Sequence, residues 1–310
     1  MKSAIKIPPI DLILCTDASK TGWGAICETD NSFSQGKWTS AQQHFHINRL
    51  ELTAVYKALC SLCSSLYAVH VLIKSDNSTA VSYLSKMGGS VGPLNDITLS
   101  IFEWCAQRNF DYLSSLAENR DLTLLSLSHK LLTLMALVSA QRSQTLACLD
   151  LRYFHFLENS CVITVMDILK TTCPKKGMGH NKLVIPNFEE NPQLCVLTAL
   201  KDYLHRTEDL RAQSGETKLF LSTRKPHKAV TSSTLARWMK CVLREAGIDA
   251  TIYSAHSFRS ASTSTAFAHG VTLQEILKTA DWTNVHTFSH FYLKAVEEPS
   301  FGNTILSCNK

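Results

Sequence analysis

The stretch SAHSFRSASTSTAFAHG, residues 254–270, contains the pair of residues that most constrains the fold and function of this chain. His256 and Arg259 are three residues apart in it, and residues at that spacing share one face of an α-helix. We therefore expect both side chains to point at one small anion.

A second stretch, DWTNVHTFSHFY at residues 281–292, adds Trp282 and Tyr292. A Tyr hydroxyl can attack a phosphodiester when neighbouring groups hold the phosphate and take up the hydroxyl proton. Together with His256 and Arg259, this order predicts a phosphate site with a tyrosine nucleophile. Each of the four residues by itself would more often belong to a core or to a solvated surface.

The composition, 45% hydrophobic and 18% charged, is that of a globular protein, and 310 residues are enough for two domains. The 11 cysteines form no regular framework and no secretory signal precedes them, which indicates a reduced intracellular setting. Cys60 and Cys63 form a CxxC, but no second pair or His follows at zinc-like spacing. Buried thiols are therefore favoured over a metal or redox site.

The run from Leu122 to Ala140 is apolar enough to suggest a membrane span. Four polar residues interrupt it: Ser126, Ser128, His129 and Lys130. We therefore predict a helix of the protein core instead.

The charge is uneven along the chain. Residues 1–113 hold 9 Lys and Arg against 9 Asp and Glu, whereas residues 114–310 hold 22 against 17. A basic second half suits a polyanionic partner such as nucleic acid, although ordinary surface charge would account for an excess of this size.

Residues 1–113 predict an α/β unit in which three carboxylates lie at strand ends or on a helix. We expect strands at 11–16, 23–28, 36–39 and 69–75, and helices at 48–62 and 77–86. The carboxylates are those of Asp17, Glu51 and Asp76. Carboxylates this close together repel one another unless a hard cation, usually Mg²⁺, lies between them. The alternative is that Asp76 caps a helix and Asp17 belongs to a turn.

The strings TDASKTGWGA, HINRLELTAVYKAL and IKSDNSTAVSYLSK resemble the ribonuclease H domain of retroelements. The resemblance covers about residues 10–112, and it implies that Asp17, Glu51 and Asp76 are three of that family's acidic metal ligands. The closing part of the family, with a fourth Asp and a His, has no match here. The resemblance therefore implies a truncated domain that binds a second metal poorly. Cleavage of RNA–DNA hybrids with Mg²⁺ is accordingly a lesser alternative for the function of the chain.

Residues 114–310 predict a mainly helical domain with a small sheet. We expect helices at 124–140, 192–206, 231–246 and 273–279 besides the one that carries His256, and short strands at 153–157, 161–169, 182–186 and 219–222. Arg142 follows the first of these helices, and Lys170 ends the second strand before the turn-rich TTCPKKGMGHN.

Six residues follow the order Arg, Lys, His-x-x-Arg, His/Trp, Tyr: Arg142, Lys170, His256, Arg259, Trp282 and Tyr292. This order resembles the active-site signature of the tyrosine recombinase (lambda-integrase) superfamily. The strings LKTTCP, SAHSFRSAS, ILKTADW and FSHFYLK are most similar to recombinases of DIRS-like and Ngaro-like retrotransposons, which also encode a ribonuclease H. Phe291 stands at the spacing from Trp282 that many recombinases use, but only Tyr292 can be a nucleophile.

The resemblance implies site-specific DNA recombination or integration through a 3′-phosphotyrosyl bond, without a metal or other cofactor. Both arginines of the set would clamp the non-bridging oxygens, and the indole N–H of Trp282 would donate to one of them. His256 would accept the Tyr292 proton or orient the phosphate. Lys170 would protonate the leaving 5′-oxygen, with Lys175 and Lys176 of the same loop as alternatives.

About thirty residues separate the ribonuclease H resemblance from Arg142, too few for the core-binding domain that recombinases usually place there. We therefore expect weak, salt-sensitive binding to double-stranded DNA. Family analogy implies a nuclear protein and a homo-tetramer on DNA, with the segment after Tyr292 docking on a neighbour. The alternative is a non-catalytic remnant that keeps the fold and weak DNA binding.

Overall fold

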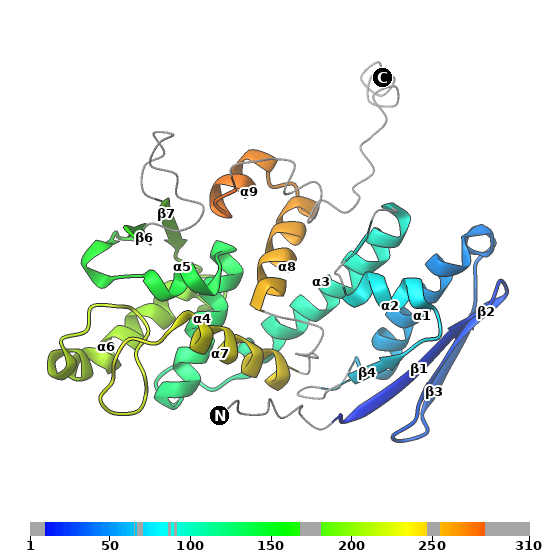
Figure 1. The fold of residues 1–310 in the computed structure, drawn as a ribbon, viewed down its shortest axis with the longest axis horizontal. Helices are drawn as coiled ribbons and strands as arrows, with labels where there is room; N and C mark the ends of the chain where they lie inside the picture. The colour runs from blue at the N-terminus through cyan, green and yellow to red at the C-terminus, as the bar shows by residue number, and fades with distance from the viewer. Residues whose placement is uncertain are drawn as a thin grey trace, which may run out of the picture.

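The computed structural model describes residues 10–64, 66, 71–85, 88–89, 92–167, 181–246 and 255–282. Two units lie side by side, and the long helix α3 (Gly92–Ser115) runs from the first toward the second (Figure 1). The first unit is a four-stranded sheet with helices. The second is mainly helical and contains a three-stranded sheet.

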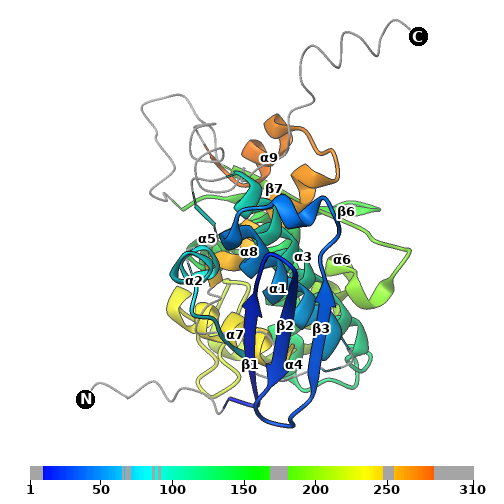
Figure 2. The ribbon, with the colours of Figure 1, turned by 90° about the vertical axis from the view of Figure 1, so that its right-hand side faces the viewer.

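The first unit is built on a sheet of order β3-β2-β1-β4, in which only the β1–β4 pair is parallel. Its elements are β1 (Leu12–Ala18), β2 (Gly22–Cys27), β3 (Phe33–Lys37), η1 (Gln42–His44), α1 (Ile47–Leu62), β4 (Val71–Lys74) and α2 (Ser78–Ser85). Buried residues alternate along β1, and α1 buries Leu50, Ala54 and Ala58 at helical spacing. Helix α1 therefore covers one face of the sheet, as Figure 2 shows with the sheet in front.

Helix α3 belongs to both hydrophobic cores. Ile101 packs into the core of the first unit, whereas Phe102 and Leu113 pack into that of the second. The Tyr112 hydroxyl donates to Glu245 Oε2 of α7 over 2.8 Å. Because its apolar residues serve two cores, they do not form one stripe, and the sequence pattern does not predict this helix. The domain boundary expected at residue 113 falls within it and stays a prediction.

The second unit combines six α-helices of the described residues with an antiparallel sheet of order β5-β6-β7. Its elements are α4 (Leu124–Ser139), α5 (Ser143–Cys148), η2 (Leu151–Tyr153), β5 (Phe154–Phe156), β6 (Ser160–Val165), β7 (Asn181–Pro186), η4 (Pro192–Leu194), α6 (Val196–Ser214), α7 (Ser232–Glu245), α8 (Ala255–Ala268) and α9 (Leu273–Thr279). The predicted helices are confirmed, and α6 extends beyond its predicted end. The strand expected at 219–222 is reduced to one isolated bridge, between Leu221 and Ala229.

Helix α4 is the centre of the second core. Leu131, Leu134 and Met135 are fully buried, and Lys130 is buried with its ammonium donating to Gln193 Oε1 over 2.8 Å. The prediction of a core helix is thus confirmed. Among the described residues, no helix combines the length and the hydrophobicity that a membrane crossing needs.

Candidate functional sites

The segment that carries Arg142 is tied to the far end of α9. Helix α4 ends at Ser139, and its C-cap residue Ala140, with a φ of 50°, turns the chain sharply. The next residue, Gln141, is buried, and its Nε2 donates to the carbonyl oxygen of Thr279 over 2.7 Å. Arg142 follows as the half-buried N-cap residue of α5. A hydrogen bond beside Arg142 thus fixes this segment against the chain that leads to Trp282.

Arg259 and Trp282 lie in direct contact. The guanidinium carbon of Arg259 lies 4.5 Å from the centroid of a Trp282 ring, and its Nη2 donates to the carbonyl oxygen of Ala280. Arg259 is 2% exposed, so its charge acts in a medium of low dielectric constant. Two contacts therefore hold the position of this guanidinium.

Helix α9 brings Trp282 to this place. A capping box fixes its start, where the Thr272 side chain accepts from Glu275 N and the Glu275 carboxylate accepts from Thr272 N. Beyond its end, Ala280 and Trp282 share a small apolar cluster with Ala140. The ends of α4 and α9 therefore meet beside Arg259 of α8.

The remaining predicted residues of this set are placed only in part. His256 lies in α8 three residues before Arg259, so the predicted helix is confirmed, but its side chain lies outside the described part of the structure. Lys170 with its alternatives, and Tyr292, also lie outside the described residues. Sequence reasoning missed Gln141. Its signal was a polar residue directly before Arg142, at the end of an apolar run.

The three carboxylates of the first unit come together. Asp17 of β1, Glu51 of α1 and Asp76 after β4 offer ligand oxygens that all lie within 4.8 Å of one another. Asp17 lies within β1, where it pairs with Gly24, so its assignment to a turn is wrong. The helix-cap alternative for Asp76 is wrong too, because Asn77 Oδ1 accepts from Ala80 N at the start of α2.

Glu51 is the buried member of this cluster. Glu51 is 4% exposed, and its Oε2 accepts no hydrogen bond from the described residues. Burial first, and then the charges of Asp17 and Asp76, raise the pKa of Glu51 to about 7. A hard divalent cation would remove this repulsion and supply the missing partner, so the three oxygens fit Mg²⁺. Elsewhere in the described chain, no other trio of His, Cys, Asp or Glu comes this close.

Comparison with known proteins agrees with the two units. The model of the phage integrase family matches residues 108–298, and that of an RNase H-like domain found in reverse transcriptase matches residues 8–100. No curated protein matches the chain.

Solved structures of recombinases are similar to this chain at low sequence identity. A crystal structure of the XerH site-specific recombinase bound to difH substrate is 12% identical, with a TM-score of 0.50 over 76% of this chain and 71% of that chain. The XerA recombinase is 16% identical, with a TM-score of 0.43 over 84% and 83%. A lambda integrase dimer bound to a COC′ core site is 13% identical, with a TM-score of 0.38 over 83% and 75%.

The second unit thus has the tyrosine recombinase catalytic fold, and the first unit is RNase H-like. The match to the phage integrase family spans more than half of the residues of this chain. The chain therefore belongs to the phage integrase family of tyrosine recombinases.

Proposed function

We propose that this chain is a retrotransposon-derived site-specific recombinase or integrase, of DIRS-like or Ngaro-like origin, that cuts and rejoins double-stranded DNA. The observation that carries the proposal is the contact of Arg259 with Trp282, beside the Gln141 hydrogen bond that fixes the Arg142 segment. Arg259 and Trp282 of the predicted phosphate site therefore lie in contact, and the hydrogen bond of Gln141 joins the segment of Arg142 to them. A tetramer on DNA and a nuclear setting belong to the same proposal.

The proposed reaction needs no outside energy. Tyr292 Oη forms a bond to phosphorus while the P–O5′ bond breaks, so the ester energy is kept in the 3′-phosphotyrosyl bond. His256 takes the Tyr292 proton, and Lys170 gives a proton to the leaving 5′-oxygen. Arg142 and Arg259 stabilise the charge that grows on the non-bridging oxygens.

A suicide substrate tests this proposal. A pool of nicked duplexes with a randomised core loses the short 5′-hydroxyl fragment on cleavage and leaves the chain on the 3′-phosphate. We expect an SDS-resistant adduct with wild type and with the control Tyr153→Phe, and none with Tyr292→Phe. An adduct that survives Tyr292→Phe removes the nucleophile assignment. If wild type forms no adduct, the non-catalytic remnant with weak DNA binding is the better interpretation.

The buried Glu51 favours a second activity, Mg²⁺-dependent cleavage of an RNA–DNA hybrid at the first unit. Asp17, Glu51 and Asp76 would hold the metal, which would polarise the phosphate and the attacking water. We expect Asp76→Asn to abolish any such cleavage and to weaken Mg²⁺ binding measured by calorimetry. Cleavage that persists in Asp76→Asn would come from another site or from a contaminant.

A further inference from the structure

We propose that Gln141 is a positioning residue for the recombination reaction. Its side chain sets the place of the Arg142 segment relative to Arg259 and Trp282, and so makes the two arginine guanidiniums converge on one phosphate. The inference rests on the proposed function and concerns the same site.

Gln141 joins the chain after α4 to the end of α9. It is 2% exposed, and its Nε2 donates to the carbonyl oxygen of Thr279, the last residue of α9, over 2.7 Å. A helix leaves its last carbonyl groups without partners inside the helix, so the carbonyl oxygen of Thr279 can accept this bond. A buried amide that lost the bond would keep the cost of its burial, so the bond holds the two segments together.

Two further hydrogen bonds complete a ring through α4, α8 and α9. On one side, Ser262 Oγ of α8 donates to the carbonyl oxygen of Leu137 in the last turn of α4. On the other side, Arg259 Nη2 of α8 donates to the carbonyl oxygen of Ala280, directly after α9. Each two of the three segments are thus joined by a hydrogen bond, and Gln141 supplies the bond between the α4 and α9 segments.

Apolar contacts bring the α4 and α9 segments together but do not fix their angle. Ala140 belongs to the apolar cluster that contains Ala280 and Trp282. Such packing is non-directional, whereas a hydrogen bond weakens steeply when its angle changes. The amide of Gln141, the residue after Ala140, therefore sets the register of the two segments.

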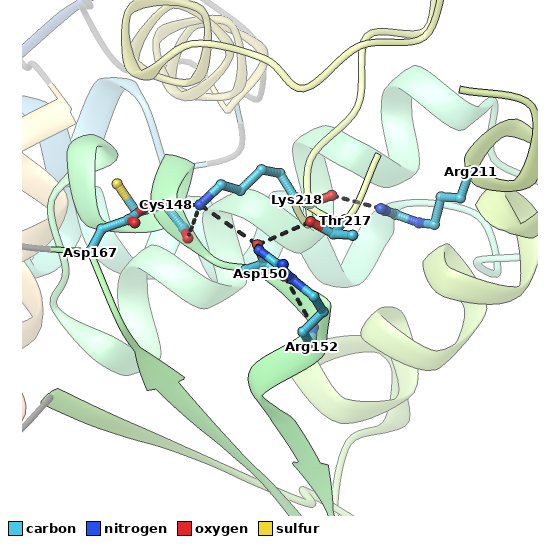
Figure 3. Close-up of polar contacts among 7 residues, drawn as sticks. All are labelled: Cys148, Asp150, Arg152, Asp167, Arg211, Thr217 and Lys218. Atoms are coloured by element: carbon cyan, nitrogen blue, oxygen red, sulfur yellow. Dashed lines mark hydrogen bonds and ion pairs between the residues drawn. The ribbon is translucent and has the colours of Figure 1, made fainter. Parts of the chain in front are cut away.

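The far end of α5 is held by other contacts, so Gln141 acts at the end that carries Arg142. Lys218 Nζ donates to the carbonyl oxygen of Cys148, the last residue of α5, over 2.9 Å (Figure 3). Leu146 of the same helix lies in the second core. Arg142 is the N-cap residue of α5, and its side chain makes no capping hydrogen bond. The backbone beside Gln141 therefore decides where the guanidinium can reach.

The relative place of the two arginines matters because both act on one phosphate. In the proposed reaction each guanidinium stabilises charge on a non-bridging oxygen, and both oxygens belong to the same phosphorus atom. A displacement of about 1 Å in such a site can lower the rate about 100-fold. Losing the Gln141 hydrogen bond releases Arg142, whereas Arg259 keeps its contacts with Ala280 and Trp282.

Gln141→Leu tests the link on two forms of the DNA sequence that wild type selects from the nicked pool. One form has a normal phosphodiester at the cleaved bond, and in the other a methyl group replaces one non-bridging oxygen. This methylphosphonate is neutral, so attack on it builds less charge for two guanidiniums to stabilise. We expect Gln141→Leu to slow adduct formation by up to about 100-fold on the phosphodiester and by far less on the methylphosphonate.

The Arg142→Ala background shows whether Gln141 acts through Arg142. Arg142→Ala should itself slow the reaction of the phosphodiester far more than that of the methylphosphonate. Adding Gln141→Leu should cause no further slowing, because the guanidinium that the amide positions is already absent. An unchanged rate for Gln141→Leu, equal slowing on both substrates, or a further loss in the Arg142→Ala background overturns the inference.

Gln144→Leu is the matched control, since it removes an exposed glutamine of α5 and should leave both rates unchanged. If Gln141→Leu fails to fold, Gln141→Glu keeps the shape of the side chain and regains a donor only when its carboxyl group is protonated. Its phosphodiester rate relative to wild type should rise as the pH falls, and a ratio that is independent of pH overturns the inference. Wild type that forms no adduct with any member of the pool instead counts against the proposed function.

Discussion

Glu51→Gln provides a sharp test of the acidic cluster through stability alone. The folded chain raises the pKa of Glu51 from its ordinary value of 4.5 to about 7, chiefly by burial. An acid with a raised pKa binds its proton more tightly in the folded state than in the unfolded state. Its protonation therefore stabilises the fold fully below pH 4.5, and this contribution is lost as the pH rises through about 7.

The size of the effect follows from the same values. A pKa difference of about 2.5 corresponds to an upper limit of about 3.4 kcal/mol in the free energy of unfolding. Asp17 and Asp76 are exposed, so water screens their repulsion of Glu51, and we expect about 1–2 kcal/mol. Without metal at pH 8, Glu51→Gln should be more stable than wild type by this amount, and at pH 4 nearly equal to it.

Urea unfolding between pH 4 and 8 measures the difference in the free energy of unfolding between Glu51→Gln and wild type. Hydrogen exchange of peptides from α1 reports on the first unit alone. Mg²⁺ should stabilise wild type at pH 8, where Glu51 is charged, and have little effect on Glu51→Gln. Glu158→Gln removes an exposed carboxylate outside the cluster and should show the wild-type pH dependence. If the free energy of unfolding of wild type stays constant between pH 4.5 and 7, the pKa of Glu51 is not raised in the folded chain.

Two further predictions concern the second unit. Arg259→Lys loses the planar contact with Trp282 and should lower the rate of adduct formation on the suicide substrate about 10²–10³-fold. Circular dichroism should show that the variant remains folded. An unchanged rate would remove Arg259 from the phosphate site. Leu131→Ala opens a cavity at a fully buried position of α4. Urea unfolding should show a loss of about 2–5 kcal/mol in the free energy of unfolding. A loss below about 1 kcal/mol would show that neighbouring side chains fill the cavity.

The local elements and the order of the chemically important residues could be predicted from the amino-acid sequence. Apolar residues at helical spacing predicted α1 and most of α6, a long apolar run predicted α4, and capping Ser and Thr residues marked the start of α7. The segment of His256 and Arg259 was expected to be helical, as α8 is. These patterns involve neighbours within one or two turns, so the residue pattern alone is enough to predict them. The types of side chain also limited the chemistry, because a carboxylate trio and an Arg–His–Tyr set suit different reactions.

Which of these residues lie in contact depends on the tertiary packing and could not be predicted from local patterns. The capping alternative for Asp76 was reasonable by local rules, yet Asn77 takes that role while Asp76 lies beside Glu51. Helix α3 was not predictable, because its apolar residues divide between two cores.

The hydrogen bond from Gln141 to Thr279 likewise joins segments that are far apart in the chain. Such contacts depend on how helices and strands pack, since packing fixes distances between residues whose separation in sequence carries no periodic signal. The sequence thus defined the candidate chemistry, and the packing of the elements defined which segments support it.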